Sequence, residues 1–377
     1  MAPPLPTMNQ PLRRHRPGPR PLGKTPGAER GEALLKVLEE AVQQTGRRAF
    51  LVLTHKGPDP DALGACVGLA GGLAQLLEAD FRVATSGRIF RAENLAMVRE
   101  LGLFFDELGN VDAARFAGGL LVDSQPGFGH TQIPTGLPVL AVIDHHRGSE
   151  DRSAAAGVRH RDVRDGVGST SAIVWEYLQG LGVQLDARMA TALFCGVRYD
   201  TGDLSQNVSA LDEQAYFELF RQADRPMLAR IQRPRLPQEY FKELQRSLRL
   251  ARRQGPAVVA LLGQVVNPES VAEMADFFLR LEGVHWTLVG GAYEGQYYVS
   301  LRTRLAELEA YPLLDRLLGG QGSFGGHGSV AGGRIGLDSG SQPALRTVER
   351  RLRTRVLEVI DPGGTLDEEA RLGRPLT

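Results

Sequence analysis

Short apolar runs recur along the first half of the chain, and their alternation with helical stretches limits the fold more than any other feature. Continuous apolar strands separated by helices are typical of a parallel sheet covered on both faces. The pattern predicts an α/β fold with an N-terminal parallel-sheet domain over residues 31–224. Its predicted strands are Ala49–Thr54, Phe81–Thr85, Leu120–Val122 and Val139–Ile143, and its predicted helices are Gly31–Gln44, Asp61–Leu77, Ser169–Leu178 and Asp186–Val197.

A second α/β pattern predicts a smaller C-terminal domain over residues 256–362, with a cleft between the two domains. Residues 225–255 are rich in Arg and are expected to form a linker and a connecting helix. A Gly-rich loop is expected at Gly319–Gly333 and a tail at 363–377. The predicted strands of this domain are Ala257–Val265, Trp286–Tyr293 and Gln296–Arg302, and its predicted helices are Ser270–Leu281, Pro312–Leu318 and Leu345–Ile360.

The first 30 residues differ in composition from the rest, with eight of the 22 prolines and six cations against one acid. Such a stretch predicts a disordered basic tail, and it lacks the apolar core of a secretory signal. No apolar run reaches the roughly 20 residues that a membrane span needs. The two cysteines, Cys66 and Cys195, fit a reducing compartment. We therefore expect a cytoplasmic protein without a membrane partner.

The formal net charge is zero, because 44 Lys and Arg balance 44 Asp and Glu. This balance argues against a broad surface for long nucleic acid. It does not argue against a phosphate substrate, because bound metal ions would supply positive charge that the composition does not count.

The first polar cluster directly follows the predicted strand Ala49–Thr54 and contains His55, Asp59 and Asp61. Ligands bind outside the carboxyl ends of strands in open α/β sheets, so these side chains can converge on a small volume. Either Asp59 or Asp61 can instead serve only as the N-cap of the following helix. The sequence leaves that alternative open.

Acids and histidines also end three further predicted elements. Asp123 follows the strand Leu120–Val122, and Asp144, His145 and His146 end the strand Val139–Ile143. Adjacent side chains on an extended segment point in opposite directions, so one histidine is expected to face a metal and the other to face elsewhere in the cleft. Asp200 follows an apolar helix and can also be a simple cap or turn residue.

Together these residues predict a metal centre made of carboxylates and imidazoles without thiolate. Such ligands suit Mn²⁺, with Mg²⁺ or Co²⁺ as alternatives. The number of anionic ligands predicts two cations, because a single one would leave an excess of negative charge. Two metals activate a water and stabilise both oxygens of an in-line phosphoryl displacement.

A glycine-rich stretch in the second domain has a histidine at its centre, with Gly325 and Gly326 before His327. Such backbone can approach a ligand closely and present N–H groups to phosphate. It lacks the Gly-Lys-Ser/Thr of a Walker loop. Arg302 ends the preceding predicted hairpin and can supply a guanidinium to the same phosphate.

The order of these motifs resembles the DHH phosphoesterase family over about residues 31–360. Asp144-His145-His146 matches the signature, and Ser300-Leu301-Arg302 with Gly325-Gly326-His327 matches the DHH-associated C-terminal domain. Length and the short linker resemble the branch of nanoRNases and 3′-phosphoadenosine 5′-phosphate phosphatases. The first motif departs by Pro60 in place of a common Gly or Asn, and the C-terminal loop lacks the frequent Pro after His327.

The resemblance implies a role for each matched residue. Asp144 would orient His145, and His146 would contact the scissile phosphate or protonate the leaving oxygen. Arg302 and the loop around His327 would bind another phosphate or the terminal nucleotide. One Mn²⁺ would be held by His55, Asp59 and Asp123, and the other by Asp61, Asp123, His145 and Asp200.

The function expected from the resemblance is hydrolysis of very short oligonucleotides or of 3′-phosphoadenosine 5′-phosphate. A cyclic dinucleotide phosphodiesterase is the first alternative. An inorganic pyrophosphatase and a non-catalytic nucleotide-binding protein are further alternatives. The expected partners are short oligonucleotides or small nucleotides, and a homodimer stays open.

Overall fold

The computed structural model describes residues 25–147, 157–305, 309–337, 342–361, 363 and 371–377, and the predicted N-terminal tail lies outside them up to residue 24. The chain divides into two compact units, Met1–Pro234 and Arg235–Thr377. The boundary falls within the predicted linker, so helix α7 (Arg225–Gln232) belongs to the first unit and helix α8 (Gln238–Leu250) to the second. No helix in the described part of the chain is long and apolar enough to cross a membrane.

The first unit contains a six-stranded sheet with all strands parallel, in the order β3-β2-β1-β4-β5-β6. This sheet confirms the predicted α/β class. The four predicted strands are present, and the short strands β3 and β6 add one at each edge. The strands are β1 (Ala49–Leu53), β2 (Asp80–Thr85), β3 (Asp106–Glu107), β4 (Gly118–Val122), β5 (Val139–Asp144) and β6 (His160–Val163).

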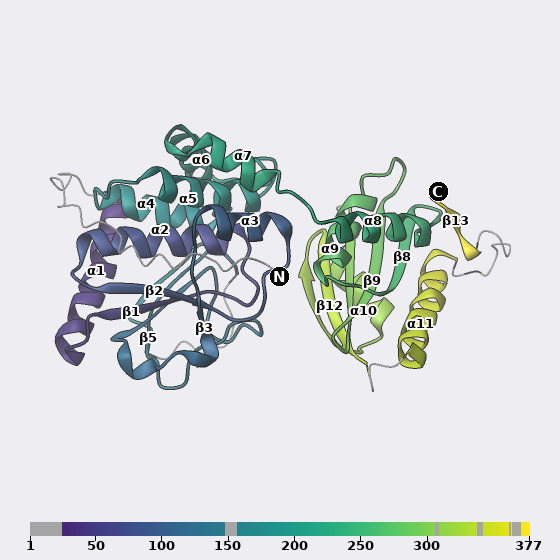
Figure 1. Cartoon of the computed structure of the whole chain (residues 1–377), viewed down its shortest axis with the longest axis horizontal. Coiled ribbons are helices and arrows are strands. Elements are labelled where there is room, and N and C mark those ends of the chain that lie inside the picture. The colour runs from purple at the N-terminus through teal and green to yellow at the C-terminus, as the bar shows by residue number, and fades with distance from the viewer. Residues whose placement is uncertain (1–24, 148–156, 306–308, 338–341, 362, 364–370) are drawn as a thin grey trace. The chain divides into compact units, whose positions relative to one another are not determined.

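The helices of the first unit share one hydrophobic core with one face of the sheet, as the layering in Figure 1 shows. The opposite face is covered by residues such as Leu108, Val111 and Ile133 from short 3₁₀ turns and connecting segments. The sheet is therefore covered on both faces, as predicted, and the second face is covered without a long helix because β4 and β5 are joined by an irregular segment. The helices are α1 (Pro26–Thr45), α2 (Pro60–Leu76), α3 (Ala92–Glu100), α4 (Thr170–Gly180), α5 (Ala187–Asp200), α6 (Ala210–Gln222) and α7.

Strand order places β1 beside β4 in the middle of the sheet. The chain continues from β1 toward β2 on one side and from β4 toward β5 on the other. Such a switch point opens a crevice outside the carboxyl ends of the two strands, where ligands bind in open α/β sheets. The segments after β1 and β4 carry His55 and Asp123.

Helix α2 lies close to α4 and α5 because its packed positions are glycines. A Cβ added at Gly64 would lie 2.4 Å from the carbonyl oxygen of Ala192 in α5. On α5, a Cβ added at Gly196 would lie 2.1 Å from Ser171 Oγ and 2.7 Å from Asp61 Oδ1. This close packing brings the first turns of α2 and α4 into contact, so that the N-terminus of α4 meets Asp61 of α2.

The second unit contains a seven-stranded sheet in the order β11-β12-β10-β9-β8-β7-β13, with only β8 and β9 pairing in parallel among the described strands. One core packs it against α10 (Ala310–Leu318) and α11 (Gln342–Ile360), and another against α8 and α9 (Glu269–Phe278). The strands are β7 (Arg252–Gln254), β8 (Ala257–Gln264), β9 (Trp286–Tyr293), β10 (Gln296–Thr303), β11 (Ser323–His327), β12 (Val330–Gly336) and β13 (Arg374–Pro375).

Two segments of the second unit are more regular than the sequence predicts. The expected Gly-rich loop at Gly319–Gly333 contains β11 and the beginning of β12, which pair antiparallel with Gly325 opposite Gly332. The end of the expected tail forms β13, which pairs with β7. Glycine has low strand propensity, and these segments are strands because the neighbouring edges supply backbone partners.

Candidate metal centre

The predicted ligands of the first unit gather at the carboxyl ends of strands and at helix ends. His55 follows β1, Asp123 follows β4, and Asp144 is the last residue of β5. Asp59 and Asp61 lie at the start of α2, and Asp200 is the last residue of α5. The fold therefore brings together all six side chains that the sequence proposes as metal ligands: His55, Asp59, Asp61, Asp123, His145 and Asp200.

Asp123 lies between two groups of side chains. On one side, His55 Nε2 is 3.5 Å from Asp123 Oδ2 and 4.0 Å from Asp59 Oδ1. On the other side, His145 Nε2 is 3.6 Å from Asp123 Oδ1 and 3.0 Å from Asp200 Oδ2. Two triplets, His55–Asp59–Asp123 and Asp61–His145–Asp200, each have ligand atoms within 4.8 Å of one another.

The backbone at Asp123 is in the left-handed region, with φ 55°, which Asp tolerates better than most residues. Its N–H donates to the carbonyl of Ile143 at 3.0 Å, so the end of β4 stays tied to β5. Thr170 Oγ1 donates to Asp123 Oδ1 at 2.9 Å. The carboxylate is thus held between the two groups.

Asp59 and Asp61 have different structural tasks in addition to their place in the cluster. Asp59 is the N-cap of α2 and accepts from the N–H groups of Asp61 and Ala62 at 3.0 Å. Asp61 is fully buried and accepts from the N–H groups of Thr170 and Ser171 at 2.6 and 2.8 Å. The positive end of α4 therefore compensates the Asp61 carboxylate.

The two candidate ligand histidines, His55 and His145, are oriented by backbone carbonyls. His55 Nδ1 lies 3.2 Å from the carbonyl oxygen of Lys56, and His145 Nδ1 lies 3.2 Å from that of Val167. A carbonyl only accepts, so each Nδ1 carries the hydrogen. Each Nε2 then faces the aspartates and would offer its lone pair to a cation that displaced its proton, which is the arrangement of a metal-binding histidine.

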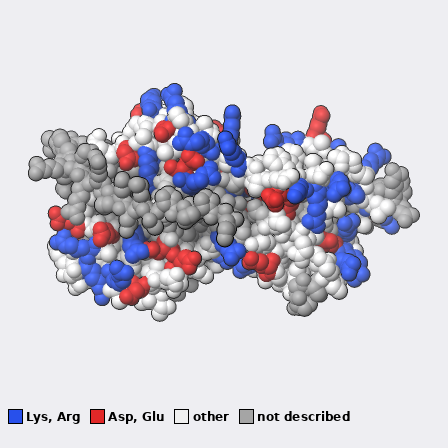
Figure 2. Space-filling view, viewed as in Figure 1, with Lys and Arg blue, Asp and Glu red and all other residues white. Residues whose placement is uncertain are grey.

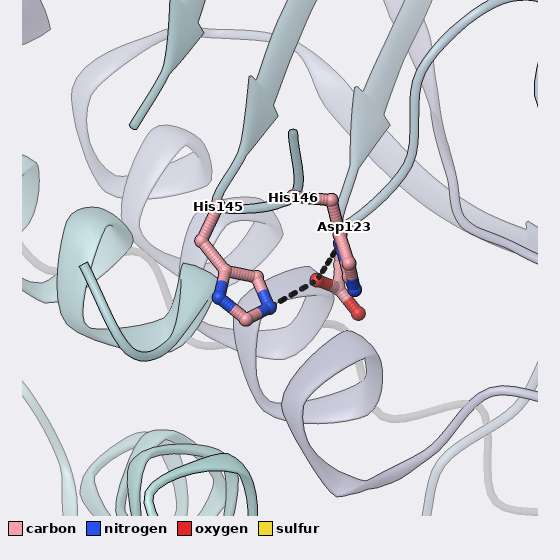
Figure 3. A group of neighbouring side chains, drawn as sticks. All are labelled: Asp123, His145 and His146. Atoms are coloured by element: carbon pink, nitrogen blue, oxygen red, sulfur yellow. Dashed lines mark ion pairs between the residues drawn. The ribbon is translucent and has the colours of Figure 1, made fainter. Parts of the chain in front are cut away.

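Asp144 orients His146 rather than His145, contrary to the role that the resemblance implies. Its Oδ1 accepts from His146 Nδ1 at 2.9 Å, whereas it contacts His145 only through the backbone N–H, also at 2.9 Å. Both histidines face Asp123, and His146 Nδ1 is 3.6 Å from Asp123 Oδ1 (Figure 3). The expectation of opposite directions is wrong because the strand ends at Asp144.

The crowding of carboxylates changes the ionisation of the cluster. Burial, followed by the Asp123 and Asp200 carboxylates, raises the pKa of Asp61 well above its usual value. Burial and then Asp59 raise the pKa of Asp200 to about 7. Burial acts to lower the pKa of His145, but the neighbouring carboxylates, first Asp200, outweigh it and raise the pKa to about 11. The site favours added positive charge.

The residues present fit divalent cations. Within the described part of the chain, the buried atoms Asp123 Oδ2 and His145 Nε2 have no hydrogen-bond partner of proper geometry. Buried polar atoms without a partner are costly, and a cation coordinated by them would remove that cost. Oxygen and imidazole donors without thiolate suit Mn²⁺ or Mg²⁺.

The candidate substrate-binding residues of the second unit lie on neighbouring strands. Arg302 on β10 is opposite Val330 on β12, and Val330 is opposite His327 on β11. Gly325 and Gly326 precede His327 on the same strand. The guanidinium of Arg302 is held inside the unit, because Nε donates to Asp276 Oδ1 at 2.5 Å and Nη1 to Ser300 Oγ at 2.7 Å.

Several residues at the candidate metal centre were not predicted from the sequence. Thr170 and Ser171 hold Asp61, and the Ser169-Thr170-Ser171 run at a helix start is a signal that could have indicated an anion partner. The ring of His130 lies edge-on to His55, with 5.6 Å between ring centroids. Gln125 contacts Asp144. His130 and Gln125 lie in an irregular segment, where periodicity gives no signal.

Comparison with known proteins identifies the family. Residues 49–197 match the DHH family, N-terminal domain. An uncharacterized protein of Methanocaldococcus jannaschii is 30% identical over 337 residues, which cover 88% of this chain and 67% of that protein. The chain belongs to the DHH family, whose members are metal-dependent phosphoesterases.

Two more distant proteins are similar over most of the chain. An A-adding tRNA nucleotidyltransferase of Geobacter sulfurreducens is 28% identical over 301 residues, 76% of this chain but only 32% of that enzyme. The structure of an exopolyphosphatase-related protein from Bacteroides fragilis superposes with a TM-score of 0.65 at 15% identity, covering 86% of this chain and 97% of that one. The latter likeness supports the fold alone.

Proposed function

We propose that this chain is a Mn²⁺-dependent phosphodiesterase or phosphatase that hydrolyses very short oligonucleotides, 3′-phosphoadenosine 5′-phosphate or both. The observation that carries the proposal is the position of Asp123 between two ligand groups, with 3.5 Å to His55 and 3.6 Å to His145. When bound, two divalent cations at such a site would activate a water and stabilise charge on the scissile phosphate. His55, Asp59 and Asp123 would hold one ion, and Asp61, Asp123, His145 and Asp200 the other.

His146 is our candidate for the proton donor to the leaving oxygen. Its Nδ1 hydrogen is engaged by Asp144, so proton transfer would occur at Nε2. Its side chain is 42% exposed, whereas that of His145 is 13% exposed. An exposed ring beside the ligand cluster can meet a phosphate without leaving its place.

Arg302 and the backbone of β11 are our candidates for holding a second phosphate of the substrate. Asp276 and Ser300 keep the guanidinium in one orientation, which reduces the entropy lost on binding. The face of the molecule in Figure 2 has cations and acids interspersed on each unit, which favours a small substrate over a long polymer.

A substrate panel with Mn²⁺ tests the proposal. We expect the purified chain to hydrolyse linear dinucleotides, short oligonucleotides or 3′-phosphoadenosine 5′-phosphate, with products resolved by chromatography. Cyclic dinucleotides and inorganic pyrophosphate belong in the panel as competing classes. Hydrolysis of only one of these competitors, or of nothing, would overturn the proposal.

The Arg302→Ala variant tests the second part of the proposal. We expect the KM to rise by about tenfold while Mn²⁺ affinity stays unchanged, because Arg302 belongs to the second unit and all candidate ligands belong to the first. Arg304→Ala is the matched control, since Arg304 is an exposed arginine two residues away. Equal KM values for the two variants would exclude Arg302 from substrate binding.

A further inference from the structure

Gln125 lies two residues after Asp123 and is nearly completely buried, with 2% of its surface exposed. Its Nε2 donates to Asp144 Oδ2 at 2.7 Å and to the carbonyl oxygen of His146 at 3.1 Å. One amide nitrogen thus bridges the side chain of Asp144 and the backbone of His146. No metal-ligand side chain is among these contacts.

Chemistry determines the orientation of this amide. Arg161 on β6 donates from Nη2 to Gln125 Oε1 at 3.1 Å, and an arginine can only donate. The Asp144 carboxylate and the His146 carbonyl only accept, so the nitrogen must face them. A glutamate at position 125 has the same shape but would place a second carboxylate against Asp144.

The Asp144 carboxylate is consequently held from both sides. Its Oδ1 accepts from the N–H groups of His145 and His146 and from His146 Nδ1, at 2.9, 3.3 and 2.9 Å. Its Oδ2 accepts from Gln125. The ring of His146 is 42% exposed and depends on Asp144 for its direction, whereas His145 also contacts the Val167 carbonyl and Asp200.

We propose that Gln125 is a positioning residue that aims His146 through Asp144, with Arg161 as its outer anchor. The inference rests on the proposed phosphoesterase function and deepens it, because it names the residues that hold the proton donor. Partners of this kind typically contribute 10-fold to 100-fold to activity. The Gln125 amide orients both the carboxylate that binds the ring and the backbone that carries it.

The first test compares Gln125→Glu with the matched control Gln75→Glu, since Gln75 also donates from Nε2 to a backbone carbonyl, that of Gln184. We expect Gln125→Glu to lower kcat about 10-fold to 100-fold, with KM and Mn²⁺ affinity within about threefold of wild type. The control should keep wild-type kcat. Wild-type kcat in Gln125→Glu would overturn the proposal, as would a loss confined to Mn²⁺ affinity.

A second measurement separates positioning from general damage. If Gln125 acts through His146, Gln125→Glu should cost no further activity in a His146→Ala background. Losses that multiply would contradict the proposed route. Arg161 is exposed, so the Arg161→Ala protein should fold even if the Gln125→Glu protein does not. Arg161→Ala should lower kcat by a smaller factor than Gln125→Glu in the wild-type background. It should leave kcat unchanged in the His146→Ala background.

A spectroscopic readout is independent of activity. In metal-free protein with ¹⁵N-labelled histidines, the His146 Nδ1 proton bound to Asp144 should give a downfield signal that His146→Ala removes. Gln125→Glu should shift or broaden this signal, and an unchanged signal would overturn the inference. If wild-type protein cleaves no substrate, the proposed function fails while this measurement still decides whether Gln125 positions His146.

Discussion

Asp123 combines a constrained backbone with the central position in the ligand cluster. Its φ of 55° lies in the left-handed region, and its carboxylate contacts Thr170 and faces His55 and His145. Asn tolerates this backbone as well as Asp does. Replacing Asp123 by Asn therefore removes the carboxylate charge and keeps the local backbone conformation.

The Asp123→Asn variant should lose the ability to hold both metals. We expect Mn²⁺ affinity and hydrolysis each to fall by roughly 100-fold or more, because an amide is a poorer ligand than a carboxylate shared by two cations. Titration calorimetry and the substrate assay measure the two effects. Asp203→Asn is the matched control, with φ 56° and 56% side-chain exposure outside the cluster. Similar losses in both variants would contradict a special role for Asp123.

At the scale of elements, the contact between α4 and α5 fixes the place of Asp61. Ser171 at the start of α4 donates to Asp61, and Gly196 on α5 leaves room for both side chains. The Gly196→Ala substitution should destabilise the first unit by about 1–3 kcal/mol and weaken Mn²⁺ binding, because the new methyl group overlaps Ser171 and Asp61. Denaturant unfolding and metal titration measure these effects.

Gly109→Ala is the control for that substitution, since a Cβ at Gly109 meets nothing within 4 Å. It should leave both stability and metal affinity unchanged. A Gly196→Ala protein with wild-type metal affinity would show that the packing of α5 does not position Asp61.

Strand β6 and helix α4 share a buried polar network. His160 Nε2 lies 2.9 Å from the hydroxyl of Tyr177, which donates to Asp162 at 2.7 Å. Arg164 binds Asp162 and Glu176, and Arg30 of α1 lies 3.8 Å from Asp162. Burial lowers the pKa of His160. Burial acts to raise the pKa of Asp162, but the hydrogen bonds from Arg164 and Tyr177 outweigh burial, so the pKa of Asp162 is lowered.

The network predicts loss of stability in mild acid. Both pKa values are lower in the folded chain, so the unfolded chain binds protons first and stability falls as pH falls. The histidine contribution is present above pH 6.5, its ordinary pKa, and is lost below it, whereas that of Asp162 is lost at lower pH.

Thermal unfolding between about pH 7 and pH 5 checks this prediction. We expect the Tm of wild type to fall more than that of His160→Gln, whose amide still donates to Tyr177 without titrating. The exposed His285→Gln in the second unit is the control and should follow wild type. Parallel curves for wild type and His160→Gln would contradict the assignment.

At the scale of the whole molecule, the two units have separate hydrophobic cores. The ligand cluster lies entirely in the first unit, and Arg302 and the β11–β12 hairpin lie in the second. Binding stabilises the state that binds, so a metal should act on the unit that holds it.

Hydrogen exchange measures this division directly. Mn²⁺ without substrate should slow amide exchange around residues 55–62 and 168–172, whose N–H groups contact or adjoin the ligand carboxylates. Residues 257–303 should exchange at the metal-free rate. The Asp123→Asn protein should lose the protection, and equal protection in both units would contradict the assignment of the cluster.

The sequence alone was sufficient for the α/β class, the four central strands and the candidate side chains that the fold brings together. Short apolar runs ending in Asp or His report both a buried strand and a polar end, and these are local properties. Asp123 and Asp144 became candidates in this way, and Asp200 became one because it follows an apolar helix. Irregular segments have no period, so Gln125 and His130 could not be recognised from pattern.

Only the tertiary structure decided how these residues act together. Strand order places β1 beside β4 through pairing between distant segments, and this determines which strand ends share a crevice. The backbone beyond β5 determines that His145 and His146 both face Asp123. The hydrogen bonds from the first turn of α4 to Asp61, and from Gln125 to Asp144, join residues far apart in the chain. Which kinds of side chain end each element is a property of the local sequence, whereas which of them meet follows from long-range packing.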